Sequence, residues 1–337
     1  MWRKHLVWFG LLMLLAMALI LALLVGKYPV SLSQVWSAIY SRVLPDASGP
    51  VVDATIDSVI WDLRVPRMAA AVLVGSTLAA AGAAYQGMFR NPLVSPDILG
   101  VSAGAGLGAV SGIFLGLSTV WIQALAFAGG LAAVAVVYTV AQLVRRHDPV
   151  LVLVLAGVAL SAFLGACISL LKILADPYTQ LSTITFWLLG GLNAVSHKDL
   201  LYALPPALLG LLPLILFRWR INLLSLSDEE ARSLGLNTAN VRGWLVVAAT
   251  LMTASAVSFT GIIGWVGLVI PHMARLLVGP NFSRLLPASL LLGGAFLLLT
   301  DTLARSMTGI ELPLGVLTAI VGAPFFLFLL AKGGRSS

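Results

Sequence analysis

The chain has 337 residues, of which 60% are hydrophobic and only 10% charged, and its formal net charge is +7. A soluble domain of this length has too little interior to bury so much apolar surface, so the composition excludes a water-soluble fold and indicates lipid as the solvent. The positive charge does not require nucleic acid as a partner, because basic residues in membrane proteins gather on one side of the bilayer.

Ten apolar stretches of membrane-spanning length follow one another, and none carries an acidic or basic residue near its middle. We therefore expect an all-α polytopic membrane protein with one transmembrane domain over residues 1–337. The predicted spans are 5–26, 66–88, 98–118, 120–144, 150–171, 199–217, 241–260, 262–278, 285–305 and 312–331. Without a carboxylate at mid-span, the sequence gives no sign of a buried proton relay.

The charged connections indicate which way the spans run. An even number of spans places both termini on the same side of the membrane. If that side is the cytoplasm, thirteen of the twenty lysines and arginines lie inside and seven outside, in agreement with the positive-inside rule. We expect both termini in the cytoplasm.

Glycine recurs every fourth residue through the third predicted span, at Gly100, Gly104, Gly108, Gly112 and Gly116. Residues with this spacing share one helix face, and a face without side chains lets another helix backbone approach closely. We favour helix packing over ligand binding for this stripe.

The sequence contains no set of residues typical of an enzyme or a metal site. It lacks a G-x-x-x-x-G-K-[ST] phosphate loop and any hydrolytic triad, and the four histidines are scattered along the chain. The single cysteine, Cys167, excludes a disulfide within the chain. We expect no catalytic residue, no metal site and no cofactor in this chain, which cannot hydrolyse ATP by itself.

One inner connection, within about 225–240, predicts a short helix that begins after Ser227. Ser227 and Glu230 have the spacing of a capping box, acidic residues favour the first turn, and Gly235 favours its end. Two turns of helix are unstable alone. Either a separate motor subunit or the chain's own spans must pack on Ala231 and Leu234, and the residues leave both possibilities open.

Three arginines lie on the outer side of the expected topology, against the inward bias of positive charge: Arg64, Arg67 and Arg305. Exposed arginines there could bind the carboxylates of a partner in bidentate fashion. The alternative is snorkelling at the interface or, for Arg305, a pair with Asp301 four residues earlier.

Five motifs in order along the chain are similar to the FecCD family, the permease subunits of type II ABC importers for iron chelates, haem and cobalamin. They are LRVPR at 63–67, QGMFRNPL at 86–93, ILGVS at 98–102, GWVGLVIPHMAR at 264–275 and ELPLG at 311–315. The resemblance covers nearly the whole chain. One departure is the link 145–151, which lacks the small hydroxyl residues that contribute to the inner gate in cobalamin importers.

The resemblance implies a ten-helix type II importer fold in the bacterial cytoplasmic membrane. Its implied partners are a second permease subunit, identical or related, two ATPase subunits that use ATP and Mg²⁺, and a periplasmic binding protein. The ATPase would contact the coupling segment, and the binding protein would meet Arg64, Arg67 and Arg305. The residues expected to couple to the ATPase are Asp228, Glu229, Glu230, Ala231, Arg232, Leu234 and Gly235.

Ferric siderophore is the first expectation for the cargo, with haem or cobalamin as the alternative. A rival of another class is a secondary transporter driven by an ion gradient. That rival predicts acidic or polar residues and interrupted helices at mid-membrane.

Overall fold

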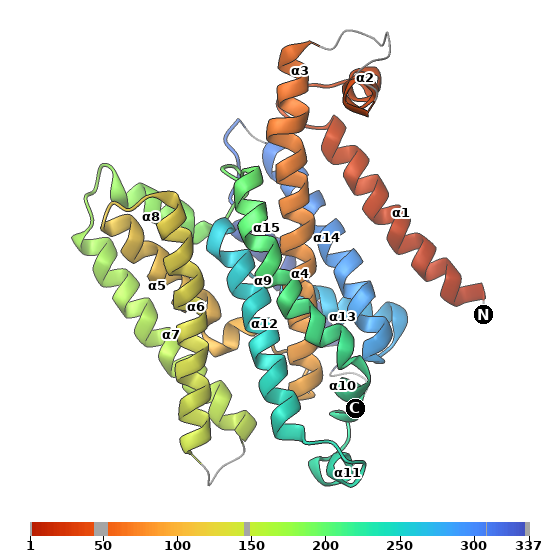
Figure 1. Ribbon diagram of the computed structural model, residues 1–337, viewed down its shortest axis with the longest axis vertical. Helices are drawn as coiled ribbons and strands as arrows, with labels where there is room; N and C mark the ends of the chain where they lie inside the picture. Colours follow the sequence, from red (N-terminus) through yellow and green to blue (C-terminus); the bar gives the residue numbers. More distant parts are fainter. Residues whose placement is uncertain (1, 44–52, 145–148, 308, 334–337) are drawn as a thin grey trace.

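The computed structural model describes residues 2–43, 53–144, 149–307 and 309–333 (Figure 1). These residues form helices and connections without a strand, so the predicted all-α fold is confirmed. The elements are α1 (Trp2–Leu24), α2 (Leu32–Val43), α3 (Ala54–Ser58), the π-helical η1 (Val59–Arg64), α4 (Val65–Phe89), the 3-10 helix η2 (Pro96–Leu99), α5 (Val101–Phe114), α6 (Thr119–Leu143), α7 (Pro149–Leu174), α8 (Gln180–Leu189), α9 (His197–Leu216), α10 (Arg218–Leu223), α11 (Asp228–Ser233), α12 (Thr238–Thr260), α13 (Val266–Val278), α14 (Phe282–Ser306) and α15 (Leu314–Gly333). Most of the link 145–151 lies outside the described residues.

Seven helices in the described part of the chain are long and apolar enough to cross a membrane: α1, the continuous helix Ala54–Phe89, α6, α7, α9, α12 and α14. The remaining three predicted spans contain the shorter apolar helices α5, α13 and α15. Backbone conformation explains two of the short lengths. Gly100 and Gly116 adopt left-handed conformations on either side of α5, and Gly261 and Trp265 do so between α12 and α13.

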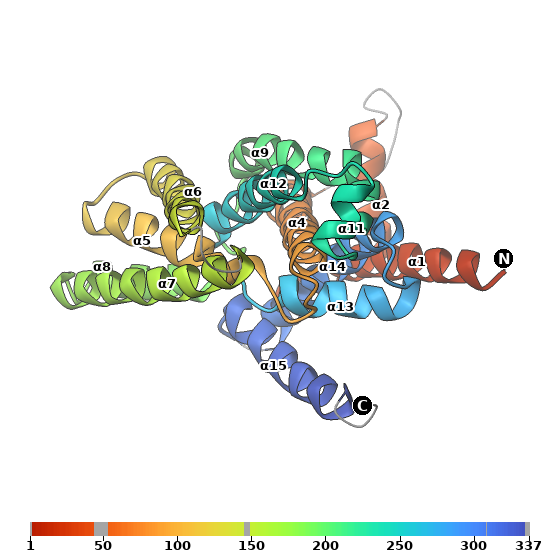
Figure 2. The ribbon, with the colours of Figure 1, turned by 90° about the horizontal axis from the view of Figure 1, so that it is seen from below.

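The helices differ strongly in how much of their surface is inside the protein. The most apolar windows of α4, α12 and α14 are 78%, 72% and 61% buried, whereas those of α1 and α7 are each 17% buried. The first three therefore form the centre, and α1 and α7 lie at the periphery on opposite sides (Figures 1 and 2). Apolar side chains on a peripheral membrane helix face lipid without cost.

Close backbone approach joins the central helices. A Cβ atom added at Gly75 would lie 2.2 Å from the carbonyl oxygen of Gly293 in α14, and one at Gly82 would lie 1.8 Å from that of Gly267 in α13. No side chain fits at either contact. Small residues let helices without a hydrophobic driving force pack in lipid.

The molecule has two ends, which we name by the helices they carry. The α2 end bears α2 and α3, and the α11 end bears α11 (Figure 1). The central helix α12 starts beside α11 and runs toward the opposite end, and this arrangement positions the candidate sites described next.

Candidate functional site

An ion-pair cluster occupies the α2 end of the two central helices α4 and α14. Arg67 donates from Nε to both carboxylate oxygens of Asp301, at 2.9 and 3.1 Å, and its Nη2 lies 2.9 Å from Oδ1. Its Nη1 donates to Glu311 Oε2 at 2.9 Å. The Asp301 side chain is only 1% exposed, so Arg67 supplies the charge that this buried carboxylate needs.

Arg64 and Arg305 bind the end of α1. Arg64 donates to the carbonyl oxygens of Leu23 and Tyr28, and Arg305 donates to that of Ala22 at 2.5 Å. The last carbonyl groups of a helix have no partner within the helix, which is why cationic donors are favourable there. The two arginines therefore fasten a peripheral helix to the centre of the protein.

The prediction that all three arginines are exposed at the surface is wrong for Arg64 and Arg305, which are 4% and 7% exposed. The Arg67 side chain is 14% exposed, and its guanidinium group is already paired with the carboxylates of Asp301 and Glu311. The pair of Arg305 with Asp301, given as the alternative, is present with Nε 3.7 Å from Oδ2. Whether any of the three contacts a partner stays a prediction.

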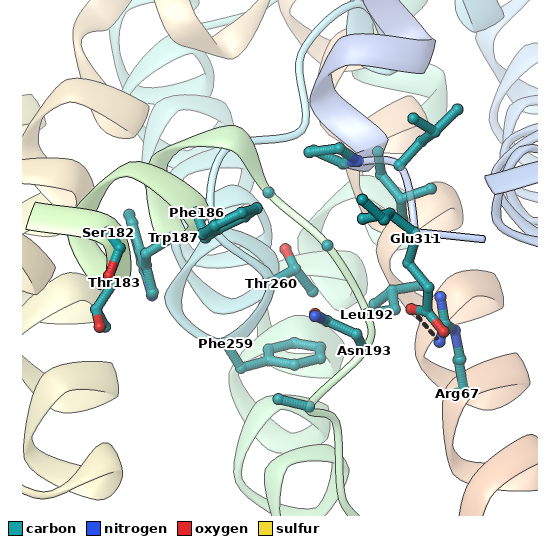
Figure 3. Close-up of a pocket in the computed structure, with 17 residues that line it drawn as sticks. Arg67, Ser182, Thr183, Phe186, Trp187, Leu192, Asn193, Phe259, Thr260 and Glu311 are labelled. Carbon is teal, nitrogen blue, oxygen red and sulfur yellow. Dashed lines mark hydrogen bonds and ion pairs between the residues drawn. The ribbon is translucent and has the colours of Figure 1, made fainter. Parts of the chain in front are cut away.

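Beside the cluster is an open cavity of about 640 Å³ (Figure 3). One wall is α8, the floor comes from the end of α12 and the loop 190–194, and the Arg67–Glu311 pair lies on the other side. Hydrogen bonds from the backbone N–H groups of Gly191 and Leu314 to the carbonyls of Thr260 and Gly190 join these segments. Gly190 has a positive φ, and a Cβ atom there would lie 2.4 Å from the Ile262 carbonyl oxygen.

The cavity presents aromatic, hydroxyl and amide groups. Its labelled side chains in Figure 3, apart from Leu192 and the ion pair, are Ser182, Thr183, Phe186, Trp187, Asn193, Phe259 and Thr260. Within the described residues no group of three His, Cys, Asp or Glu side chains could hold a metal ion. This lining can contact a large polar or aromatic guest.

Sequence reasoning did not identify this cavity. Its walls come from segments far apart in the chain. The Gly190–Gly191 pair is a sequence signal that could have indicated a tight junction there, although the sequence analysis did not use it. The pairing of Arg67 with Asp301, 234 residues away, was also missed.

At the α11 end, the predicted short helix is present with its capping box. The Ser227 side chain accepts from the Glu230 N–H at 3.2 Å, and Glu230 Oε2 accepts from the Ser227 N–H at 2.9 Å. Ala231 is fully buried against the chain's own helices, whereas Leu234 is 59% exposed. Gly235 has a φ of +80° just after the helix. Of the two possible contacts, the chain's own spans thus cover Ala231 and leave Leu234 open.

Asp228 anchors this helix to two others. It accepts from Arg242 of α12 at 2.7 and 2.9 Å and from Arg90, at the end of α4, at 2.8 Å. The hydrogen bonds from Arg242, with the positive charges of Arg242 and Arg90, hold the pKa of the Asp228 carboxyl below its usual range. Glu229, Glu230 and Arg232 form no ion pair with described residues and are exposed.

The glycine stripe splits into two kinds of position. Gly104, Gly108 and Gly112 face α6, and a Cβ atom at Gly108 would lie 2.1 Å from the Leu125 carbonyl oxygen. Gly100 and Gly116 lie outside the helix. Gly100 precedes its first residue, Gly116 follows its last turn, and both have positive φ values. The four-residue spacing thus marks a packing face only at its three inner members.

Taken together, the apolar helices and their close central packing define a multi-pass membrane protein. A profile described as the FecCD transport family matches residues 14–332. The chain belongs to the FecCD family of ABC transporter permeases.

Individual relatives agree with this assignment. The molybdate import system permease protein MolB of Haemophilus influenzae is 36% identical over 97% of each chain. A "probable iron chelatin transport system permease protein" of Helicobacter pylori (strain 26695) is 45% identical over 83% of this chain and 84% of the relative. A solved inward-facing structure of a metal-chelate type ABC transporter has a TM-score of 0.87 and 36% identity, covering 98% of this chain and 99% of the other.

Proposed function

We propose that this chain is the permease subunit of a bacterial importer in the cytoplasmic membrane and that its cargo is an iron chelate, ferric siderophore first. Family membership and the 45% identity to an iron chelatin permease support this proposal. Haem or cobalamin carried by the same machinery is the alternative within the class. The α11 end would face the cytoplasm, together with both termini, and the α2 end the periplasm.

The observation that carries the proposal is the short helix α11, fixed on one side and open on the other. Ala231 and the ion pairs of Asp228 attach it to the protein, while Glu229, Arg232 and Leu234 remain exposed. A six-residue helix attached in this way presents a fixed surface to which a partner can bind. In this proposal the partner is an ATPase subunit, which binds ATP and Mg²⁺ itself, so that this chain needs no cofactor.

The position of α12 suggests how movement at α11 would reach the cargo. This 23-residue helix begins at Thr238, directly after α11, is tied to α11 through Arg242, and ends at Thr260 in the cavity. A helix of that length moves as a rod. Closure of two ATPases would displace α11, tilt α12 and change the cavity, which a second permease subunit would complete into a passage.

On the periplasmic side, the proposed docking partner is a substrate-binding protein with acidic surface residues. Arg67 is the most accessible of the three predicted arginines, and a partner's carboxylate would have to replace or join Glu311 on it. Arg64 and Arg305 would act indirectly in this proposal, by holding the end of α1 beside the docking surface.

A transport assay with the complete system tests the proposal. The chain is reconstituted in vesicles with its ATPase subunits and binding protein, and uptake of radiolabelled ferric siderophore is measured with and without vanadate. We expect vanadate-sensitive uptake that the substitution Leu234→Asp abolishes and Ser233→Ala leaves unchanged. Uptake by this chain alone, driven by an ion gradient, would instead support the secondary transporter and contradict the proposal.

Molybdate is a second candidate cargo, because MolB matches 97% of the chain. Radiolabelled molybdate in the same vesicles separates the two. Vanadate-sensitive uptake of molybdate without siderophore uptake would support the proposed importer but identify molybdate as its cargo.

A further inference from the structure

A second cavity, of about 440 Å³, lies near the α11 end, between α10 and the connection from α13 to α14. It takes no part in the function proposed above. Polar lining groups come from Asn222, Ser225, Arg275 and Asn281, and no carboxylate lines it. The polarity of this lining suits an anionic group.

Arg275 gives the cavity its charge. Its Nη2 donates to the Gln86 Oε1 at 3.1 Å, and the buried Gln86 amide is itself held by a bond from Nε2 to the Leu268 carbonyl oxygen at 3.0 Å. Arg275 is partly buried and forms no ion pair with any described residue. A partly buried cation without a counterion is unfavourable, so a negative group from outside the chain would be stabilised here.

Three more arginines lie on α10 and α14, two helices that help to line the cavity. Arg218 and Arg220 of α10 and Arg284 of α14 are exposed, and none of them forms an ion pair within the described part of the chain. Arg220 lies over the ring of Phe217, at 5.1 Å. These arginines add positive charge to α10 and to the first turn of α14, the two helices that contribute Asn222 and Phe282 to the cavity.

The cavity lies at the level where membrane-spanning helices end. α4 ends at Phe89, α9 ends at Leu216 and α14 begins at Phe282, and α10 packs against all three. Trp219 lines the cavity and is 65% exposed, as expected of an aromatic residue at headgroup depth. Beside Arg275, Leu276 and Leu277 expose apolar side chains that acyl chains could cover.

From these contacts we propose that the Arg275 cavity binds the phosphate headgroup of an anionic phospholipid. The arginine and the Asn222 and Asn281 amides would hold the phosphate, with the acyl chains along the last turn of α13. Basic pockets between helices at this depth have the chemistry that such headgroups require. The bound lipid would fasten α10 to the α13–α14 connection.

Native mass spectrometry of the purified full-length chain, without ATPase, tests this site. The chain is offered equal amounts of phosphatidylglycerol and phosphatidylcholine, and retained lipid is measured. We expect preferential retention of phosphatidylglycerol, reduced about fivefold by Arg275→Gln, the effect of one basic contact. Arg42→Gln, which removes an exposed charge at the α2 end, should leave retention unchanged.

A second variant covers the possibility that Arg275→Gln fails to fold. Asn222→Asp keeps the oxygen that accepts from the Phe282 N–H at 2.7 Å but adds a negative charge to the cavity, so it should also lose the lipid. Equal retention of the two lipids by the native chain, or unchanged preference in both variants, would overturn the proposal. Displacement of the bound lipid by inorganic phosphate would assign the site to free phosphate and would also overturn the proposal.

Discussion

Arg67 holds two carboxylates that reach it from different segments, Asp301 in α14 and Glu311 in the connection before α15. The two contacts are unequal. Asp301 is 1% exposed and takes two nitrogens of the guanidinium group, while Glu311 is 29% exposed and takes one. Removing the partner of a buried charge lowers the stability of the protein more than breaking an ion pair that is partly exposed to solvent.

We therefore expect Arg67→Gln to destabilise the protein far more than Glu311→Gln. The first leaves Asp301 with only Arg305, at 3.7 Å, and should cost about 3–5 kcal/mol, while the glutamine of the second still accepts from Arg67 and should cost about 1 kcal/mol or less. Thermal unfolding in detergent measures both. Equal small shifts would mean that Asp301 does not depend on Arg67.

The anchoring of α11 should depend on pH through Asp228. Its pKa is lowered in the folded protein, so the ion pairs contribute fully above the ordinary aspartate value of about 3.9 and are lost as pH falls through the lower, folded value. Hydrogen exchange of the α11 amides, corrected for intrinsic rates, should show constant protection from neutral pH down to about 5 and weaker protection below 4.

The substitution Asp228→Asn should remove this pH dependence and lower the protection at neutral pH about fivefold, the effect of roughly 1 kcal/mol from partly exposed ion pairs. Glu229→Gln, at the next residue and with an exposed side chain, is the control and should change neither the pH dependence nor the protection at neutral pH. Protection that falls equally in the control would show that overall charge, rather than the Asp228 contacts, holds the helix.

Among the elements, α5 and α6 pack through glycine rather than through interlocking side chains. Gly104, Gly108 and Gly112 present backbone to the facing helix, and the Gly129 Cβ position is likewise only 2.3 Å from the Gly104 carbonyl oxygen. Contacts this close have no room for a methyl group. The helices would have to move apart, which loses dispersion contacts along the whole pair.

Gly108→Ala should therefore destabilise the protein by about 1–3 kcal/mol, although alanine has the higher helix propensity. Gly165→Ala in α7 is the matched control, because nothing lies within 4 Å of its Cβ position. We expect an unchanged or slightly higher unfolding temperature for that variant. A loss of the same size in both variants would show that the cost does not come from the close contact between α5 and α6.

Across the whole molecule, α12 links the α11 end to the cavity at the other end. If α12 moves as a rod in the proposed importer, ATP binding by the proposed ATPase subunits should change the distance between α8 and the segment before α15. Spin labels on Thr183→Cys and Ile310→Cys, in a Cys167→Ser background, report this distance by double electron–electron resonance. The change should disappear when Leu234→Asp is added, and a distance that never responds to ATP would contradict the rod.

Contacts between residues close together in the sequence could be predicted, and contacts between residues far apart could not. The capping box of α11 joins residues three apart, and its spacing predicted both hydrogen bonds. Burial of Arg64 and Arg305 depends on carbonyl groups of α1 that lie 41 and 283 residues away, and no local pattern reports such contacts. The exposure predicted for these arginines was wrong for that reason.

Apolar length, helix caps and ordered motifs are local properties, so the order of residues alone was enough to predict an all-α membrane protein, the approximate positions of its apolar helices and its family. The three-dimensional arrangement was needed to find the Arg67–Asp301–Glu311 cluster and the cavity between α8 and α15. It was also needed to explain why α5 and α13 are short. These features arise from contacts between distant segments and from single backbone conformations, which depend on packing rather than on residue type alone.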